Sequence, residues 1–94
     1  MINKIKLKKA RNKIDKLDKN IFRLIKQRTK IVKHMLSLKR YKSEIIDKKR
    51  MNEVFRHIKK ESIKEGIDPK ITSRIWKAII WAYVNFQKKN FKKR

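Results

Sequence analysis

Apolar residues recur at helical spacing through the first forty residues of the chain. From Leu7 to Leu38 the positions step alternately by three and four residues, and nine of the ten are apolar or small. They are Leu7, Ala10, Ile14, Leu17, Ile21, Leu24, Arg28, Ile31, Met35 and Leu38. A heptad row of this kind is typical of a helix that packs against other protein along its length. The pattern predicts one long helix from about Ile5 to about Arg40.

Two shorter helices are expected after a connection at Tyr41 to Ile46. Asp47 suits the N-cap of the first of them, whose apolar stripe is Met51, Val54, Phe55 and Ile58. Gly66 fits the position that closes this helix, and Asp68-Pro69 fits the cap and first turn of the next. The apolar row of that third helix is Ile71, Ile75, Ala78, Ile79, Ala82 and Phe86. With one glycine and one proline in 94 residues, the sequence predicts an all-α fold.

The length of the first helix predicts an intertwined homodimer. At 1.5 Å per residue such a helix is roughly 50 Å long, whereas a compact chain of this size has a radius of gyration near ~12 Å. The helix would overhang its own domain, so a second copy is expected to cover its apolar row. We expect residues 1–94 to form a single domain, with a core at about 5–88 and a basic tail at 88–94 that frays.

Arg28 is the charged exception in the apolar row. An unpaired buried charge is costly, and no aspartate or glutamate falls on the row, so a ligand anion is a candidate partner. Lys39 follows eleven residues later, about 20° round the helix and about 16 Å along it. Both side chains can therefore converge on one small ligand. Arg11 lies about 100° round the axis from Arg28, so it can join only from a partner chain.

The third helix carries a second stripe that mixes apolar and polar residues. Ile80, Tyr83, Val84 and Gln87 are spaced to share one face of this helix. Arg50, in the first turn of the second helix, is a further candidate cation.

The composition limits the classes of function. No cysteine is present, which excludes disulfides and thiolate metal sites. No apolar run approaches ~18 residues, and the N-terminus lacks a secretory signal pattern, so a soluble cytoplasmic protein without membrane partners is expected. The net charge of +23 allows a nucleic-acid-binding helical dimer as an alternative. Because the lysines are spread over all helices, without an aromatic platform, specific nucleic-acid binding is not the favoured function.

Several segments together resemble the all-helical class of chorismate mutases. They are RNKIDKLDKNIFRLIKQR (residues 11–28), Lys39, DKKR (47–50), GIDPKITSRIWKAII (66–80) and Gln87. The resemblance covers about residues 10 to 90. Members of that class are intertwined dimers of three-helix chains with two identical sites, in agreement with the length argument.

The resemblance implies a cationic cage for a dicarboxylate. Arg28 would bind one carboxylate and Arg11 of the other subunit the second, as forked donors. Lys39 and Gln87 would donate to the ether oxygen whose bond to carbon breaks. The implied reaction converts chorismate to prephenate in aromatic amino-acid biosynthesis. It is pericyclic, so no cofactor, metal or nucleophile is expected.

Asp47 and Arg50 would line the entrance or hold the cage in shape. Two further implied site residues depart from the family pattern. Met51 stands where the family usually has a glutamate that contacts the substrate hydroxyl. Tyr83 stands where a small serine is common. Both departures are more similar to the isochorismate pyruvate lyases, which share the fold and produce salicylate and pyruvate. Lyase activity is therefore the alternative to mutase activity.

Overall fold

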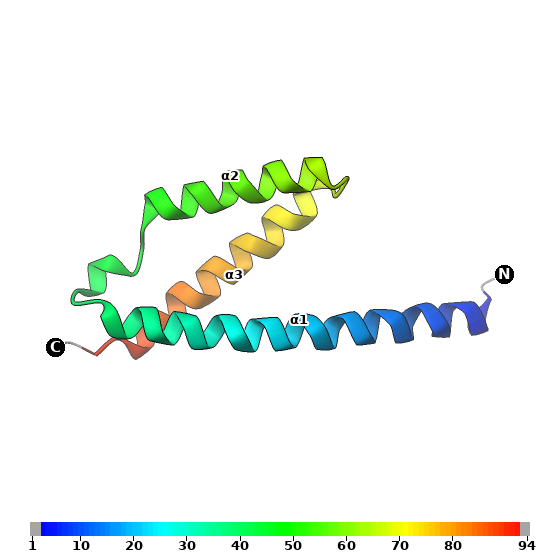
Figure 1. Cartoon of the computed structure of the whole chain (residues 1–94), viewed down its shortest axis with the longest axis horizontal. Coiled ribbons are helices and arrows are strands. Elements are labelled where there is room, and N and C mark those ends of the chain that lie inside the picture. The colour runs from blue at the N-terminus through cyan, green and yellow to red at the C-terminus, as the bar shows by residue number, and fades with distance from the viewer. Residues whose placement is uncertain (1–2, 93–94) are drawn as a thin grey trace. The chain divides into compact units, whose positions relative to one another are not determined.

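The structure is a computed structural model that describes residues 3–92 (Figure 1). It contains three α-helices and a short 3-10 helix, η1 (Lys42–Glu44); the α-helices are α1 (Lys4–Leu38), α2 (Lys48–Lys64) and α3 (Pro69–Asn90). The all-α prediction is confirmed, and residues 3–92 include no strand. Nor does any helix in this range have the length and apolar character needed to cross a bilayer. The chain divides into two compact units, one ending at His34 and one beginning at Met35. The single-domain organisation stays a prediction.

The first unit is helical almost throughout. The Asn3 side chain caps α1, since its Oδ1 accepts a hydrogen bond from the backbone N–H of Lys6 at 3.0 Å. The predicted long helix is confirmed, although it ends at Leu38, two residues before the predicted Arg40. Much of its apolar row is exposed in the single chain, with each of the following residues more than half exposed: Ile14, Leu17, Ile21, Leu24 and Ile31.

The connection after α1 is more ordered than a plain loop. Glu44 accepts a hydrogen bond from the backbone N–H of Arg40 at 3.0 Å and closes a tight turn that contains η1. Ile45 follows η1 directly and is among the most buried residues described, at 5% exposure. The sequence assigned this segment only a connecting role, whereas the structure uses it to supply a core residue.

The boundaries of α2 and α3 follow the predicted capping residues. Asp47 caps α2, and Asp68 caps α3 by accepting from the N–H of Lys70 at 2.9 Å. Pro69 occupies the first turn of α3. Gly66 has a φ of 70°, the left-handed conformation that glycine adopts without steric cost. These residues form a tight turn between α2 and α3 (Figure 1), and the two helices contact one another.

The core of the second unit forms around Ile45, Ile80 and Val84. Half-buried apolar residues pack against it from the end of α1, the connection before α2, α2 itself and the residue after α3; they are Leu36, Ile46, Met51, Val54, Phe55 and Phe91. A buried hydroxyl pair adds a polar link between α2 and α3, because Ser62 Oγ lies 2.6 Å from Thr72 Oγ1. Ser62 also donates to the carbonyl of Ile58 at 2.6 Å, so this buried polar group is satisfied.

The predicted third helix is confirmed as α3. Its predicted apolar row is largely exposed in the single chain, including Ile71 and Ile75, because α2 packs on the stripe that contains Ile80 and Val84. The helix continues to Asn90, and Phe91 packs on the core; fraying of the basic tail from position 88 stays a prediction. Residues 93–94 of the predicted tail lie outside the described residues.

Candidate functional site

Lys39 and Gln87 are brought together across 48 positions of sequence. Lys39 follows the last residue of α1, and its backbone N–H donates to the carbonyl of Leu36 at 3.1 Å. Gln87 lies in the C-terminal part of α3 and is 8% exposed. The Lys39 Nζ donates to Gln87 Oε1 at 2.7 Å. The two residues predicted to act on the same ligand oxygen are therefore in direct contact.

The orientation of the Gln87 amide is fixed from both sides. An ammonium has only donors, so the group that faces Lys39 must be the amide oxygen. The Gln87 Nε2 donates to the backbone carbonyl of Tyr83 at 3.2 Å. An amide nitrogen carries two hydrogens, and this bond uses one. The second hydrogen is the donor that a ligand oxygen beside Lys39 requires.

The electrostatics of Lys39 reflect its partial burial. Desolvation lowers the pKa of the Lys39 ammonium below the ordinary 10.5, while the carboxylates of Glu44 and Asp47 act in the opposite direction without cancelling this effect. A partly desolvated ammonium binds an anion more strongly than one in bulk water, because screening is weaker. The site therefore suits a ligand group that carries or develops negative charge.

Sequence reasoning did not identify Glu44 as part of this environment. Its carboxylate accepts from the Arg40 N–H and partly offsets the lowering of the Lys39 pKa by desolvation. No motif marks it, because its position depends on the turn that η1 makes after α1. The sequence offered one signal for Glu44, namely that it is the one acidic residue in the predicted connection from Tyr41 to Ile46.

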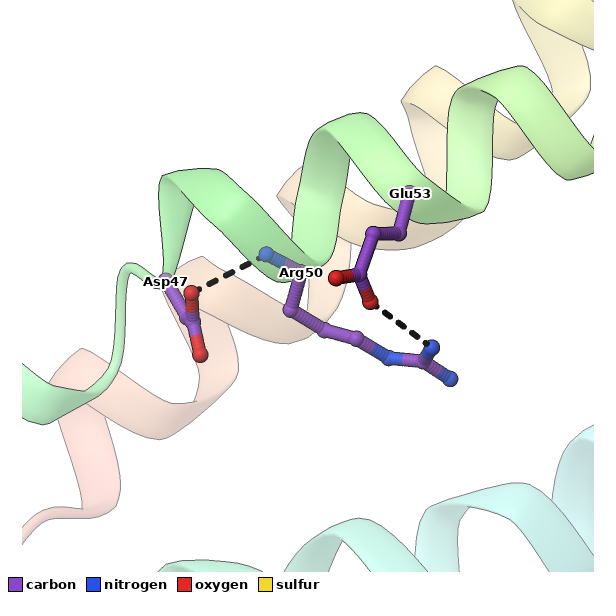
Figure 2. Close-up of polar contacts among 3 residues, drawn as sticks. All are labelled: Asp47, Arg50 and Glu53. Carbon is purple, nitrogen blue, oxygen red and sulfur yellow. Dashed lines mark hydrogen bonds and ion pairs between the residues drawn. The ribbon is translucent and has the colours of Figure 1, made fainter.

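Asp47 is the N-cap of α2, and Arg50 lies in the first turn of this helix (Figure 2). The Asp47 Oδ1 accepts from the backbone N–H of Arg50 at 3.0 Å, which is the helix cap. The Arg50 guanidinium reaches along the helix to Glu53, with Nη1 3.7 Å from Oε2. The Arg50 side chain is 70% exposed, and exposed ion pairs contribute little. Arg50 can therefore exchange Glu53 for another anion at small cost.

Met51 and Tyr83 are both half-buried, in different surroundings. Met51 packs against the core of the second unit and lines a groove between α2 and α3 with Phe55 and Trp81. Tyr83 supplies the carbonyl that orients Gln87. The sequence predicted both as contacts for substrate, and that role stays a prediction.

Arg11 and Arg28 lie in the first unit, on α1, and both are exposed in the single chain. The other six predicted site residues lie in the second unit. A complete cage that combines the two sets stays a prediction.

Comparison with protein families decides the relationship of this chain. Residues 10–88 match the family model described as chorismate mutase type II. The chain belongs to the chorismate mutase type II family. No significant match was found among curated proteins or solved structures. The matched range contains all eight predicted site residues of this chorismate mutase family member, from Arg11 to Gln87.

Proposed function

We propose that the protein is a chorismate mutase that converts chorismate to prephenate. The observation that carries the proposal is the contact between the Lys39 ammonium and the buried Gln87 amide at 2.7 Å, within a chain that belongs to the family. The reaction breaks a carbon–oxygen bond, and negative charge develops on the ether oxygen. A charged donor and an amide donor held side by side stabilise that charge more than they stabilise the ground state.

The rest of the rate enhancement in this proposal comes from holding a folded conformer of the substrate. Arg28 binds one carboxylate and Arg11 of a partner chain binds the other, as bidentate donors. Arg50 closes the entrance, at the small cost of leaving Glu53. No residue forms a bond to the substrate, so the mechanism needs only positioned cations, an amide and exclusion of water.

The proposed site requires a homodimer. The apolar row of α1 is exposed in the single chain, and contiguous apolar surface of this kind marks an interaction site. A second copy that covers this row would also desolvate Arg28, which lies on it. Sedimentation of the intact protein at micromolar concentration tests this step, and a folded monomer would rule out the shared site. The cytoplasmic location also stays a prediction.

Isochorismate pyruvate lyase is the second candidate. Met51 is half-buried and apolar, so the site lacks the carboxylate that would accept a hydrogen bond from the ring hydroxyl of chorismate. The loss of one such contact commonly costs about 1–3 kcal/mol. Lyase and mutase share the cage and the breaking carbon–oxygen bond, so Met51 and Tyr83 are the residues that favour the lyase.

The test offers chorismate and isochorismate separately to the purified protein and identifies the products. We expect prephenate from chorismate. Met51→Glu should raise kcat/KM for chorismate about tenfold if it restores the missing acceptor, while Met51→Gln adds a polar group of the same size without the charge. Salicylate and pyruvate as the only products would replace the mutase assignment with the lyase, and no product from either substrate would refute both.

A further inference from the structure

The groove between α2 and α3 combines apolar and cationic side chains. It has a volume of about 660 Å³, within the usual range of roughly 300–1,000 Å³ for small-molecule sites. Its apolar part includes Met51, Phe55 and Trp81, and the first two are half-buried. Neither Lys39 nor Gln87 lines this groove, whereas Met51 belongs both to the groove and to the predicted substrate site.

The charged residues that line the groove are all cations. They are Lys59, Lys70, Arg74 and Lys77, each exposed. No aspartate or glutamate is among its lining residues. Helical spacing explains the arrangement, because Arg74, Lys77 and Trp81 follow one face of α3, whereas Met51, Phe55 and Lys59 follow one face of α2. Apolar side chains and exposed cations thus line the same groove.

We propose that this groove binds a small amphiphilic anion, an aromatic carboxylate in chemical class, at a site that adjoins the predicted substrate site through Met51 but does not include Lys39 or Gln87. Charge complementarity selects the anion, since four cations line the groove without a compensating acid. The indole of Trp81 and the ring of Phe55 select an aromatic body. The volume of about 660 Å³ matches that of a small-molecule site.

The site has a built-in connection to the candidate active site. Met51 lines the groove and also packs on the core that contains Ile80 and Val84. Val84 lies one turn of α3 before Gln87. A ligand that contacts Met51 therefore touches the same packed cluster that supports the α3 segment with the catalytic amide.

The test uses 3-phenylpropionate as the probe and two-dimensional amide and indole NMR of the intact protein as the readout. We expect saturable shifts of the Trp81 indole N–H, assigned with Trp81→Phe, and a Kd of about 1 mM or tighter for a ligand of this size. The uncharged 3-phenylpropan-1-ol should bind about tenfold more weakly. Arg74→Ala combined with Lys77→Ala should weaken the carboxylate by about tenfold, whereas Arg56→Ala should not, because Arg56 is exposed on α2 without lining the groove.

Three results would overturn the proposal. Equal binding of the acid and the alcohol would remove the role of charge, and equal weakening by Arg56→Ala would indicate nonspecific attraction to a basic protein. Shifts centred on the Gln87 side-chain amide would place the probe in the candidate active site. A change at Trp81 that follows protein concentration without the probe would show that a second copy occupies the groove. Because binding is measured directly, none of these results depends on whether the protein turns over chorismate.

Discussion

Replacing Gln87 by leucine separates the catalytic role of the amide from its structural role. Leucine is similar in size and apolar, so the substitution removes the acceptor for Lys39 and the donor to the Tyr83 carbonyl without a large cavity. The Lys39 bond joins a charged group and contributes about 1.5–3 kcal/mol at most. Lys39 is only half-buried and can turn to water, so we expect a loss of stability of about 1–2 kcal/mol. This corresponds to a fall in Tm of roughly 4–16 °C for a chain of this length.

The effect on turnover should be much larger than the effect on stability. Removal of one preorganised donor from a site that stabilises developing charge typically lowers kcat about 100- to 1,000-fold. Asn90→Leu is the matched control, because the Asn90 side chain makes the same kind of bond, to the Phe86 carbonyl at 2.8 Å, from an exposed position. We expect that control to retain its activity and to change in stability by less than about 0.5 kcal/mol.

Gln87→Glu provides a second test of the catalytic role, because a purely structural role of Gln87 does not predict the pH dependence expected of this variant. An ionised carboxylate still accepts from Lys39 but repels the charge that develops on the ether oxygen. Activity of this variant should therefore be low at neutral pH and should rise as the pH falls and the carboxyl gains a proton. Steady-state assays of chorismate loss, paired with thermal melts, give both quantities. A Gln87→Leu enzyme that is folded and within tenfold of the wild-type kcat/KM would refute the assigned role.

Three further predictions concern charge. The kcat/KM for chorismate should fall as the pH rises through the pKa of Lys39, which lies below 10.5 because burial lowers it. Glu44→Gln should move this alkaline fall in kcat/KM to a still lower pH. A fall centred at pH 10.5 or above would contradict the burial argument. Arg11→Ala and Arg28→Ala should each abolish turnover, and refolding the two proteins together should restore part of it if the site is shared between chains; no recovery would place Arg11 outside the site. Thermal stability should rise with moderate salt, because salt screens the repulsion within a chain of net charge +23; melts that fall with salt would indicate that attractive ion pairs dominate.

The helix boundaries were predictable from sequence because local chemistry determines them. Asp47 and Asp68 satisfy the first backbone N–H groups of their own helices, and Gly66 adopts a conformation that few other residues tolerate. Each of these effects acts within a few residues of its cause. By contrast, the burial of Ile45 depends on how the connection after Leu38 turns, and nothing in the local pattern determines that turn.

The candidate site was predictable only in part, for a related reason. The resemblance identified Lys39 and Gln87, which the structure joins. It did not identify Glu44, whose influence on Lys39 depends on the turn through η1. The role of the Tyr83 carbonyl could likewise not be predicted from side-chain identity, because every residue has a backbone carbonyl. The sequence reveals which side chains are unusual, whereas the orientation of the Gln87 amide is a property of the folded helix.

Packing within a single chain explains only one of the two apolar rows of α3. One row contains Ile80 and Val84 and is buried against α2. The other contains Ile71 and Ile75 and is exposed in the same chain, although its spacing is equally regular. A helix that is apolar on two faces needs two partners, and α2 supplies only one. The exposed apolar rows of α1 and α3 thus both need a second chain to cover them. The row of α3 is an argument for the proposed dimer that does not depend on the length of α1.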